Sequence, residues 1–277
     1  MQTTFHKAAL VASTALSLSF VTVAAQAFPQ LPVGSNLNFN TYTGSAPKNC
    51  FTCVAPTGWT GGSGLIYVDS PTQGGTYPVG IQTYGNPSGA IPGNYVEADG
   101  NPHYESGFSR ELTGLTVGQT YTLSFYQAAS QQNGFSGSTT NQWIVSLGTS
   151  GLFSASASDP SVGNTSCGSS CVYSNLDPTA SIAASTLMGP IPTGTTVGWN
   201  YVSVNLTANA TNDLLSFLAW GDNGNTANLP PIAFLSGVNA PKGLGVPEPV
   251  SLSLFGVGLV GLAAVTRRRR GNRSTLG

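Results

Sequence analysis

Residues 120–126, TYTLSFY, show the alternation that decides the fold class of this chain. Side chains on a β-strand point alternately to its two faces, so Tyr121, Leu123 and Phe125 share one face. Residues 142–147, QWIVSL, and residues 201–207, YVSVNLT, alternate in the same way. Each segment therefore predicts a strand with one face in a core.

The rest of the middle region follows the same pattern of strands and turns. Residues 214–220, LLSFLAW, form a nearly continuous apolar run, which is typical of a strand buried on both faces. Clusters of Gly, Pro, Asn and Ser separate the segments and indicate turns, as in residues 221–224, GDNG. Further strands are expected at residues 37–42, 65–68, 94–98, 108–112 and 232–238. Because helical periodicity is missing between the two ends, the sequence predicts an all-β antiparallel sandwich.

The first 27 residues have the organisation of a secretory signal peptide. Lys7 precedes a mostly apolar stretch over residues 8–24, and Ala25-Gln26-Ala27 has the small-x-small pattern of a cleavage site. An ordinary buried helix is the alternative, but it does not explain the order of these three features. We therefore expect an exported protein whose folded body begins at residue 28.

The C-terminal region combines a short motif, an apolar segment and a basic cluster. Pro247, Glu248 and Pro249 precede residues 250–265, which carry no charge, and an arginine cluster follows. At about 1.5 Å per residue, this helix would cover most of a hydrocarbon core of roughly 30 Å. Basic residues beside a span stay on the cytoplasmic side, which places the body outside. The basic cluster consists of Arg267, Arg268, Arg269 and Arg270.

The body has the length of one domain and very few charges. We assign residues 28–240 to the sandwich, 241–246 to a linker and 247–273 to the C-terminal signal. Residues 28–246 contain three basic and nine acidic side chains, a net charge of −6. A sparsely charged, acidic body has no basic patch for phosphate contacts, so nucleic acid is excluded as a partner.

The four cysteines all lie in this body, where an exported protein is expected to form disulfides. They are Cys50, Cys53, Cys167 and Cys171. We favour two local pairs, Cys50 with Cys53 and Cys167 with Cys171, over cross-pairing. Zinc is the other interpretation of the C-x-x-C spacing, but the matching ligand pairs that it requires are missing.

The C-terminal features resemble the PEP-CTERM sorting signal of Gram-negative bacteria. The resemblance covers the Pro-Glu-Pro motif, the apolar segment and the arginine cluster of residues 247–273. It implies that an exosortase recognises the tail and processes it near the motif, in an organism that makes exopolysaccharide. The expected route is a precursor anchored in the inner membrane, then the cell surface or extracellular matrix. A plain single-span anchor is the alternative.

The body is similar to PEP-CTERM proteins that have a galactose-binding-like jelly roll. The similarity is carried by residues 95–102, 112–129, 141–143, 214–219 and 233–238. It implies a jelly-roll sandwich related to carbohydrate-binding modules. Many such modules hold a structural calcium ion with carboxylates near the chain ends, but this chain has Asn40 and Ser236 there. The sequence therefore predicts no cofactor, with calcium kept as an alternative.

Two groups of residues are candidate sites in the body. Glu97 and Asp99 would share a strand face, and a hairpin would return Glu105 beside Asn101; the set fits a solvated turn, a calcium site or a catalytic pair. Aromatic rings beside loops can stack on sugars, and core or rim positions are their ordinary alternative. The aromatic candidates for glycan contact are Trp59, Tyr84, Tyr104 and Trp220.

The sequence thus predicts a non-enzymatic, exported surface or biofilm-matrix protein that binds glycan or exopolysaccharide. A hydrolase triad is not expected, because the body has a single histidine, His103, and no nucleophile in a strand-to-helix turn. The alternatives are a secreted glycan-acting hydrolase and a structural adhesive protein without a specific ligand.

Overall fold

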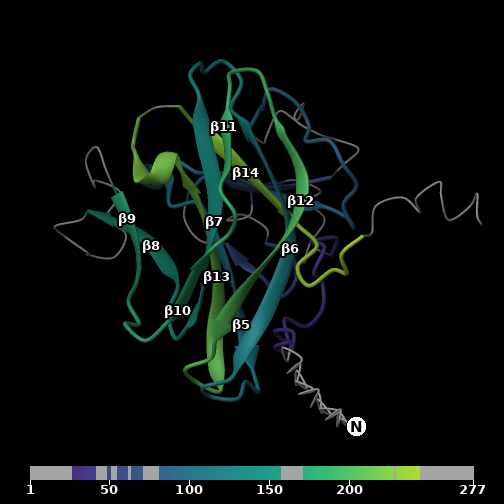
Figure 1. Ribbon diagram of the computed structural model, residues 1–277, viewed down its shortest axis with the longest axis vertical. Helices are drawn as coiled ribbons and strands as arrows, with labels where there is room; N and C mark the ends of the chain where they lie inside the picture. Colours follow the sequence, from purple (N-terminus) through teal and green to yellow (C-terminus); the bar gives the residue numbers. More distant parts are fainter. Residues whose placement is uncertain are drawn as a thin grey trace, which may run out of the picture.

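The computed structural model describes residues 27–41, 49–50, 55–61, 64–70, 81–156, 171–227 and 229–243 (Figure 1). Residues 1–26 of the predicted signal peptide and the whole predicted sorting signal lie outside these ranges. Nearly all regular structure in the described ranges is β. Within these ranges, no helix has the length and apolar character needed to span a bilayer.

The first sheet contains six strands, and each pairs with its neighbours in the antiparallel sense. In spatial order they are β1 (Asn49–Cys50), β3 (Ile66–Asp69), β4 (Tyr95–Asp99), β14 (Pro231–Ser236), β6 (Thr120–Gln131) and β12 (Val197–Thr207).

The second sheet is also antiparallel, and a separate hairpin accompanies it. Its order is β10 (Ser181–Ala184), β7 (Thr139–Gly148), β13 (Asn212–Gly221), β5 (Gly107–Thr113) and β2 (Thr60–Gly61), with β11 (Met188–Ile191) also paired to β7. The hairpin consists of β8 (Leu152–Ser156) and β9 (Cys171–Asn175), and the short 3₁₀ helices are η1 (Pro102–Tyr104) and η2 (Asp222–Gly224).

The strand order is consistent with the expected jelly-roll type. Eight strands can be numbered one to eight in chain order: β4, β5, β6, β7, β10, β12, β13 and β14. In the first sheet, their spatial order is one, eight, three and six. In the second sheet, the spatial order is two, seven, four and five. The chain thus crosses repeatedly between two antiparallel sheets, as in sandwiches built from Greek keys. The all-β antiparallel sandwich is confirmed.

The core lies between the sheets and contains the faces that the alternation predicts. Leu123 and Phe125 of β6 meet Trp143 of β7 and Phe217 of β13 there, and all four are almost completely buried. Phe217 also stacks on Phe108 of β5, with ring centroids 4.9 Å apart. Aromatic contacts of this kind add to the free energy gained by burial.

The strand expected at residues 37–42 is wrong over residues 37–41, which form a turn. The Asn36 side chain closes it, because its Nδ2 donates to the Thr41 carbonyl at 2.9 Å and its Oδ1 accepts from the Thr41 N–H at 3.0 Å. Phe39 adopts a left-handed φ of 55° inside the turn and reaches the core. Side-chain hydrogen bonds therefore replace the strand ladder here.

The outer faces of the two sheets are covered differently. On the first sheet, Tyr95 and Phe234 are buried beneath Ile81 of the preceding loop and beside Trp199. On the second sheet, the hairpin β8–β9 lies over the strands through an apolar cluster that includes Leu218 and Trp220. The hairpin covers only part of this face, and a cavity opens beside η2.

Candidate functional site

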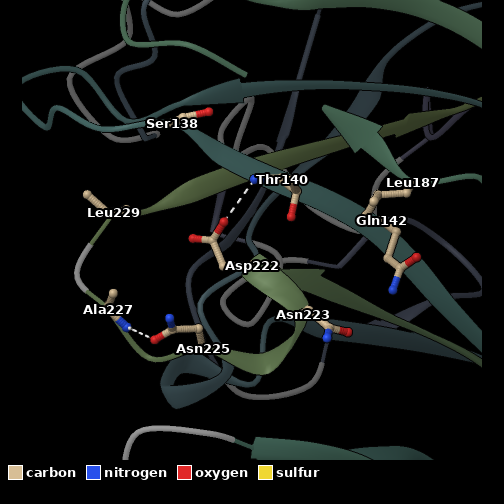
Figure 2. Close-up of a pocket in the computed structure, with 9 residues that line it drawn as sticks. All are labelled: Ser138, Thr140, Gln142, Leu187, Asp222, Asn223, Asn225, Ala227 and Leu229. Atoms are coloured by element: carbon tan, nitrogen blue, oxygen red, sulfur yellow. Dashed lines mark hydrogen bonds between the residues drawn. The ribbon is translucent and has the colours of Figure 1, made fainter. Parts of the chain in front are cut away.

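The candidate site is a cavity of about 560 Å³ at the outer face of the second sheet (Figure 2). The start of β7 forms one wall, and η2 with the following loop forms the other. Leu187, between β10 and β11, reaches the cavity beside Gln142. The lining residues are Ser138, Thr140, Gln142, Leu187, Asp222, Asn223, Asn225, Ala227 and Leu229.

Asp222 fixes the two walls to each other. Its Oδ1 accepts a hydrogen bond of 2.9 Å from the Thr140 N–H (Figure 2) and another of 2.9 Å from the Thr139 hydroxyl. Its Oδ2 is shielded from solvent and has no hydrogen-bond partner among the described residues. Burial raises the pKa of Asp222, while the hydrogen bonds from Thr140 and Thr139 oppose that shift.

The backbone of η2 has an uncommon conformation beside this carboxylate. Asp222 and Asn223 both adopt left-handed φ values, 46° and 52°. Residues other than glycine rarely enter this region, although Asp and Asn tolerate it best. Strained backbone persists where the surrounding structure fixes it, and it is frequent at functional sites. Here the conformation places Asp222 against β7 and turns Asn223 to the open side.

Two amide side chains offer the cavity free hydrogen-bonding groups. Gln142 is partly exposed and Asn223 is exposed, and Figure 2 shows both amides on the same side of η2. Neither amide makes a hydrogen bond with the described residues, whereas Asn225 Oδ1 accepts from the Ala227 N–H at 2.9 Å. Leu187 is 53% exposed and adds an apolar contact surface. The cavity thus combines donors, acceptors and an apolar wall.

The aromatic candidates from the sequence do not gather at this cavity. Trp59 and Trp220 are 5% and 2% exposed, so burial removes both from the predicted glycan-contacting set. The indole of Trp59 packs on Phe39 and Phe108 in the core. Trp220 lies in β13, on the strand expected at residues 214–220, and the Trp59 indole N–H donates to the Asn36 carbonyl at 3.1 Å, beside the turn of residues 37–41.

The two tyrosine candidates are more accessible but separate from the cavity lining. Tyr104 ends η1 and is 41% exposed. Tyr84 is partly buried, and its hydroxyl donates to the Phe135 carbonyl. Glycan contact by either tyrosine stays a prediction.

The carboxylate candidates occupy a different part of the molecule. Glu97 and Asp99 share the outer face of β4, as predicted, but they are 2% and 0% exposed. The predicted hairpin is wrong, because β4 belongs to the first sheet and β5 to the second, with η1 between them. Glu105 therefore lies in the connection between the two sheets and lines a second cavity, of about 140 Å³.

Hydrogen bonds explain how the residues after β4 leave the sheet. Asp99 Oδ1 accepts from the Asn101 N–H at 2.8 Å, and Asn101 Oδ1 accepts from the His103 N–H at 3.1 Å. Asn101 thereby caps η1, whose first residue is Pro102. Side chains that bind the backbone two residues ahead are typical of turns, which supports the turn interpretation of this segment.

Burial in an apolar environment changes the protonation of these carboxyl groups. It raises the pKa of Asp99 to about 7, although the Asn101 N–H opposes the shift. It also raises the pKa of Glu97 well above its usual value, and the negative charge of Asp69 adds to the effect. A raised pKa keeps a carboxyl group protonated up to a higher pH, and a protonated carboxyl group is a poor ligand for a hard cation.

A calcium site at the chain ends does not fit the residues present. Asn40 Oδ1 accepts from the Asn94 N–H at 2.9 Å, and the Ser236 hydroxyl donates to the Asn94 carbonyl at 2.8 Å. Both positions thus hold the start of β4 instead of presenting carboxylates. Across the described ranges, no group of three His, Cys, Asp or Glu side chains is arranged to hold a metal ion.

The remaining predicted positions are only partly within the described ranges. Cys171 is disulfide-bonded at the start of β9. Cys53 and Cys167 lie outside the described residues, as does the side chain of Cys50, so the pairing stays a prediction. Pro247, Glu248, Pro249 and Arg267 to Arg270 also lie outside them.

Sequence reasoning identified residues 221–224 as a turn and did not recognise them as a site. The available signal was an Asp-Asn pair directly after a strand buried on both faces. A strand of this kind has neighbours on both sides, so the polar residues that follow its end can approach a neighbouring strand. Gln142 could not be singled out, because its role depends on the pairing of β7 with β13.

Comparison with protein-family models finds no match, and comparison with curated proteins finds none either. Among solved structures, the chain is similar to the arabinose-bound MgGH51 α-L-arabinofuranosidase, with 16% identity and a TM-score of 0.34. That match covers 74% of this chain and 28% of the other. A CBM4 structure matches with 13% identity and a TM-score of 0.29, over 74% of this chain and 96% of the other. The chemistry of the site therefore rests on this chain's own residues.

Proposed function

We propose that this chain is an exported, non-enzymatic glycan-binding protein and that the cavity beside η2 is its binding site. The observation that carries the proposal is the pair of free amides, Gln142 and Asn223, beside the exposed apolar side chain of Leu187. Amides donate and accept hydrogen bonds, as sugar hydroxyls do, and an apolar wall suits the C–H face of a sugar ring.

The charges of the cavity support a neutral ligand. Among the described residues that line the cavity, Asp222 alone is ionisable, so a carboxylate or phosphate would meet a negative charge without a cation. A cationic ligand would also find little compensation, because Asp222 Oδ1 is hydrogen-bonded to β7 and its Oδ2 is shielded from solvent. A polyhydroxylated, uncharged molecule matches the lining best.

Binding fits this lining better than hydrolysis does. Glycosidases commonly use two carboxyl groups about 5 to 10 Å apart across the scissile bond. Among the described lining residues, only Asp222 carries a carboxyl group, and the acidic pair on β4 is buried within the other sheet. Released reducing sugar from any tested glycan would favour the hydrolase alternative.

A glycan array with the full-length protein in detergent tests the proposal. We expect a restricted set of neutral glycans to bind, and the double variant Gln142→Ala/Asn223→Ala to weaken binding about tenfold or more, since each hydrogen bond contributes roughly 1 kcal/mol. Gln82→Ala, which removes an exposed amide elsewhere, is the matched control. A wild-type protein that binds nothing would favour a purely structural adhesive role.

We further propose that an exosortase system sorts the protein to the cell surface or exopolysaccharide matrix. The support is the order of Pro247-Glu248-Pro249, the apolar residues 250–265 and the arginine cluster, together with the N-terminal signal peptide. The inner membrane is then a partner of the precursor, through the apolar segment.

Reversal of the basic cluster tests this second proposal. With Arg267 to Arg270 changed to Glu, we expect loss of retention or of processing, because the positive charges set the orientation of the span. Cell fractionation and mass spectrometry of the mature C-terminus provide the measurement. Normal processing of the variant would contradict the sorting assignment.

A further inference from the structure

Tyr173 on the hairpin β8–β9 is an exposed aromatic side chain in a fixed position. It is 38% exposed, and its ring meets the buried ring of Trp220 edge-to-face, with centroids 5.4 Å apart. Exposed aromatic rings that are held in one position lose little entropy on binding, so they act as efficient contact surfaces. The position of Tyr173 beside the cavity therefore suits contact with a ligand.

Three contacts place this tyrosine next to the proposed binding site. Trp220, on which Tyr173 packs, is the register partner of Gln142 in the cavity wall. Gly224 at the end of η2 lies against the start of β9, and a Cβ on it would come within 2.3 Å of the Cys171 carbonyl oxygen. Figure 1 shows the yellow-green turn of η2 between β9 and β11. The hairpin thus adjoins the wall that carries Asn223.

The hairpin is fixed to the second sheet by polar and apolar contacts. Asn175 Nδ2 donates to the Ser146 hydroxyl at 3.1 Å, and the Leu152 N–H donates to the Ser216 hydroxyl at 3.2 Å. The two hydroxyls also bond each other at 2.7 Å. Cys171 packs in the apolar cluster beneath the hairpin and is disulfide-bonded. These contacts hold Tyr173 in place before any ligand arrives.

We infer that Tyr173 forms a second, aromatic subsite, so that the site takes an oligosaccharide of at least two units. This inference rests on the proposed function. The amides at η2 bind the hydroxyls of one sugar, and the tyrosine ring stacks on the apolar face of a neighbouring unit. The two subsites use different chemistry, so their contributions can be separated by the length of the ligand.

Titration calorimetry on the full-length protein in detergent tests the inference. The probes are glucose, mannose and xylose, each with its β-1,4-linked oligomers of two to six units. For the wild type, we expect affinity to rise about tenfold between the monosaccharide and the longer oligomers of at least one series. Tyr173→Ala should abolish this rise and leave monosaccharide affinity within about twofold.

Two further variants separate stacking from a general disturbance of the hairpin. Tyr173→Phe keeps the ring and should retain the dependence on length. Val172→Ala shortens an exposed side chain on the same strand and should also retain it. A length dependence that persists in Tyr173→Ala would overturn the inference while leaving the proposed function intact. Failure of the wild type to bind any of the three series would also overturn it, and the glycan array would then test the proposed function separately.

Discussion

The outer faces of the two sheets carry acidic residues in opposite environments. On the first sheet, Asp99 lies in the protein interior, and its pKa is raised to about 7 by burial. On the second sheet, Asp222 borders a cavity and accepts two hydrogen bonds from β7. One face is sealed by its covering loop, whereas the other is only partly covered by a hairpin.

The difference shows that a sandwich of this kind can separate stability from binding. The sealed face gains free energy from apolar burial but must shield carboxyl groups that water would otherwise solvate. The partly covered face leaves amides, a leucine and a tyrosine exposed to solvent, which offers little stability but suits a ligand. Substitutions on the two faces should therefore affect different measurements.

The largest expected effect is the removal of an aromatic ring from the sealed face. Phe234 is 2% exposed and meets Tyr95 and Trp199, with ring centroids 5.5 and 6.2 Å away. Phe234→Ala should lower the free energy of unfolding by about 3–5 kcal/mol, because it deletes buried contacts and leaves a cavity. Urea denaturation monitored by tryptophan fluorescence provides the measurement.

Tyr173→Ala is the matched change on the partly covered face. We expect it to lower the free energy of unfolding by less than about 1 kcal/mol, as is usual for exposed positions. Similar losses in the two variants would show that the faces do not differ in the way proposed. The comparison also shows whether a loss of binding by Tyr173→Ala reflects the ring itself.

The next largest effect is expected at Asp99, a buried carboxyl group of β4. Asp99→Asn preserves the oxygen that accepts from the Asn101 N–H and removes the ionisable group. Because the pKa of Asp99 is about 7 in the folded protein and 3.8 is its ordinary value, ionisation at high pH costs up to about 4 kcal/mol. Asp99→Asn should therefore raise the free energy of unfolding at pH 8 by about 2–4 kcal/mol.

The sign of the pH dependence provides the check. A carboxyl group with a raised pKa contributes stability that is fully present below about pH 4 and is lost as the pH rises through about 7. The wild type should thus lose stability over this window, while Asp99→Asn should lose less and match it near pH 4. Parallel pH profiles of the two proteins would contradict the assignment.

The sequence predicts the sandwich well because its long strands alternate strictly. Residues 120–126 and 142–147 lie inside β6 and β7, with their apolar faces in the core as expected. The hairpin β8–β9 and the edge strands β10 and β11 were not predicted. Their sequences are short and show no alternation of apolar and polar residues, as in CVYSN of β9, SIAA of β10 and MGPI of β11.

The candidate site was harder to predict, because its parts are distant in sequence. Gln142 and Asn223 come together only through the pairing of β7 with β13, and the hairpin adds Tyr173 from a third segment. Two of the four aromatic candidates failed for a related reason. Trp59 and Trp220 stand beside glycine-rich stretches in the sequence, but the fold buries both rings.

The smallest expected effect tests how the hairpin is held on the partly covered face. Asp177 follows β9, and its carboxylate accepts five hydrogen bonds, from the N–H and hydroxyl of Thr149, the N–H and hydroxyl of Thr179, and the Asn209 amide. These bonds, led by the Thr149 N–H, lower the pKa of Asp177, in contrast to Asp99. Asp177→Asn should therefore reduce the melting temperature slightly at pH 7. The contribution of a carboxylate with a lowered pKa is present above about pH 4 and is lost as the pH falls further, so the two proteins should converge in acid.

Hydrogen exchange at the Thr149 and Thr179 amides should become faster in the variant. Glu111→Gln, which changes an exposed carboxylate on β5, is the control. Unchanged exchange at both amides would show that the apolar cluster under the hairpin suffices to hold it.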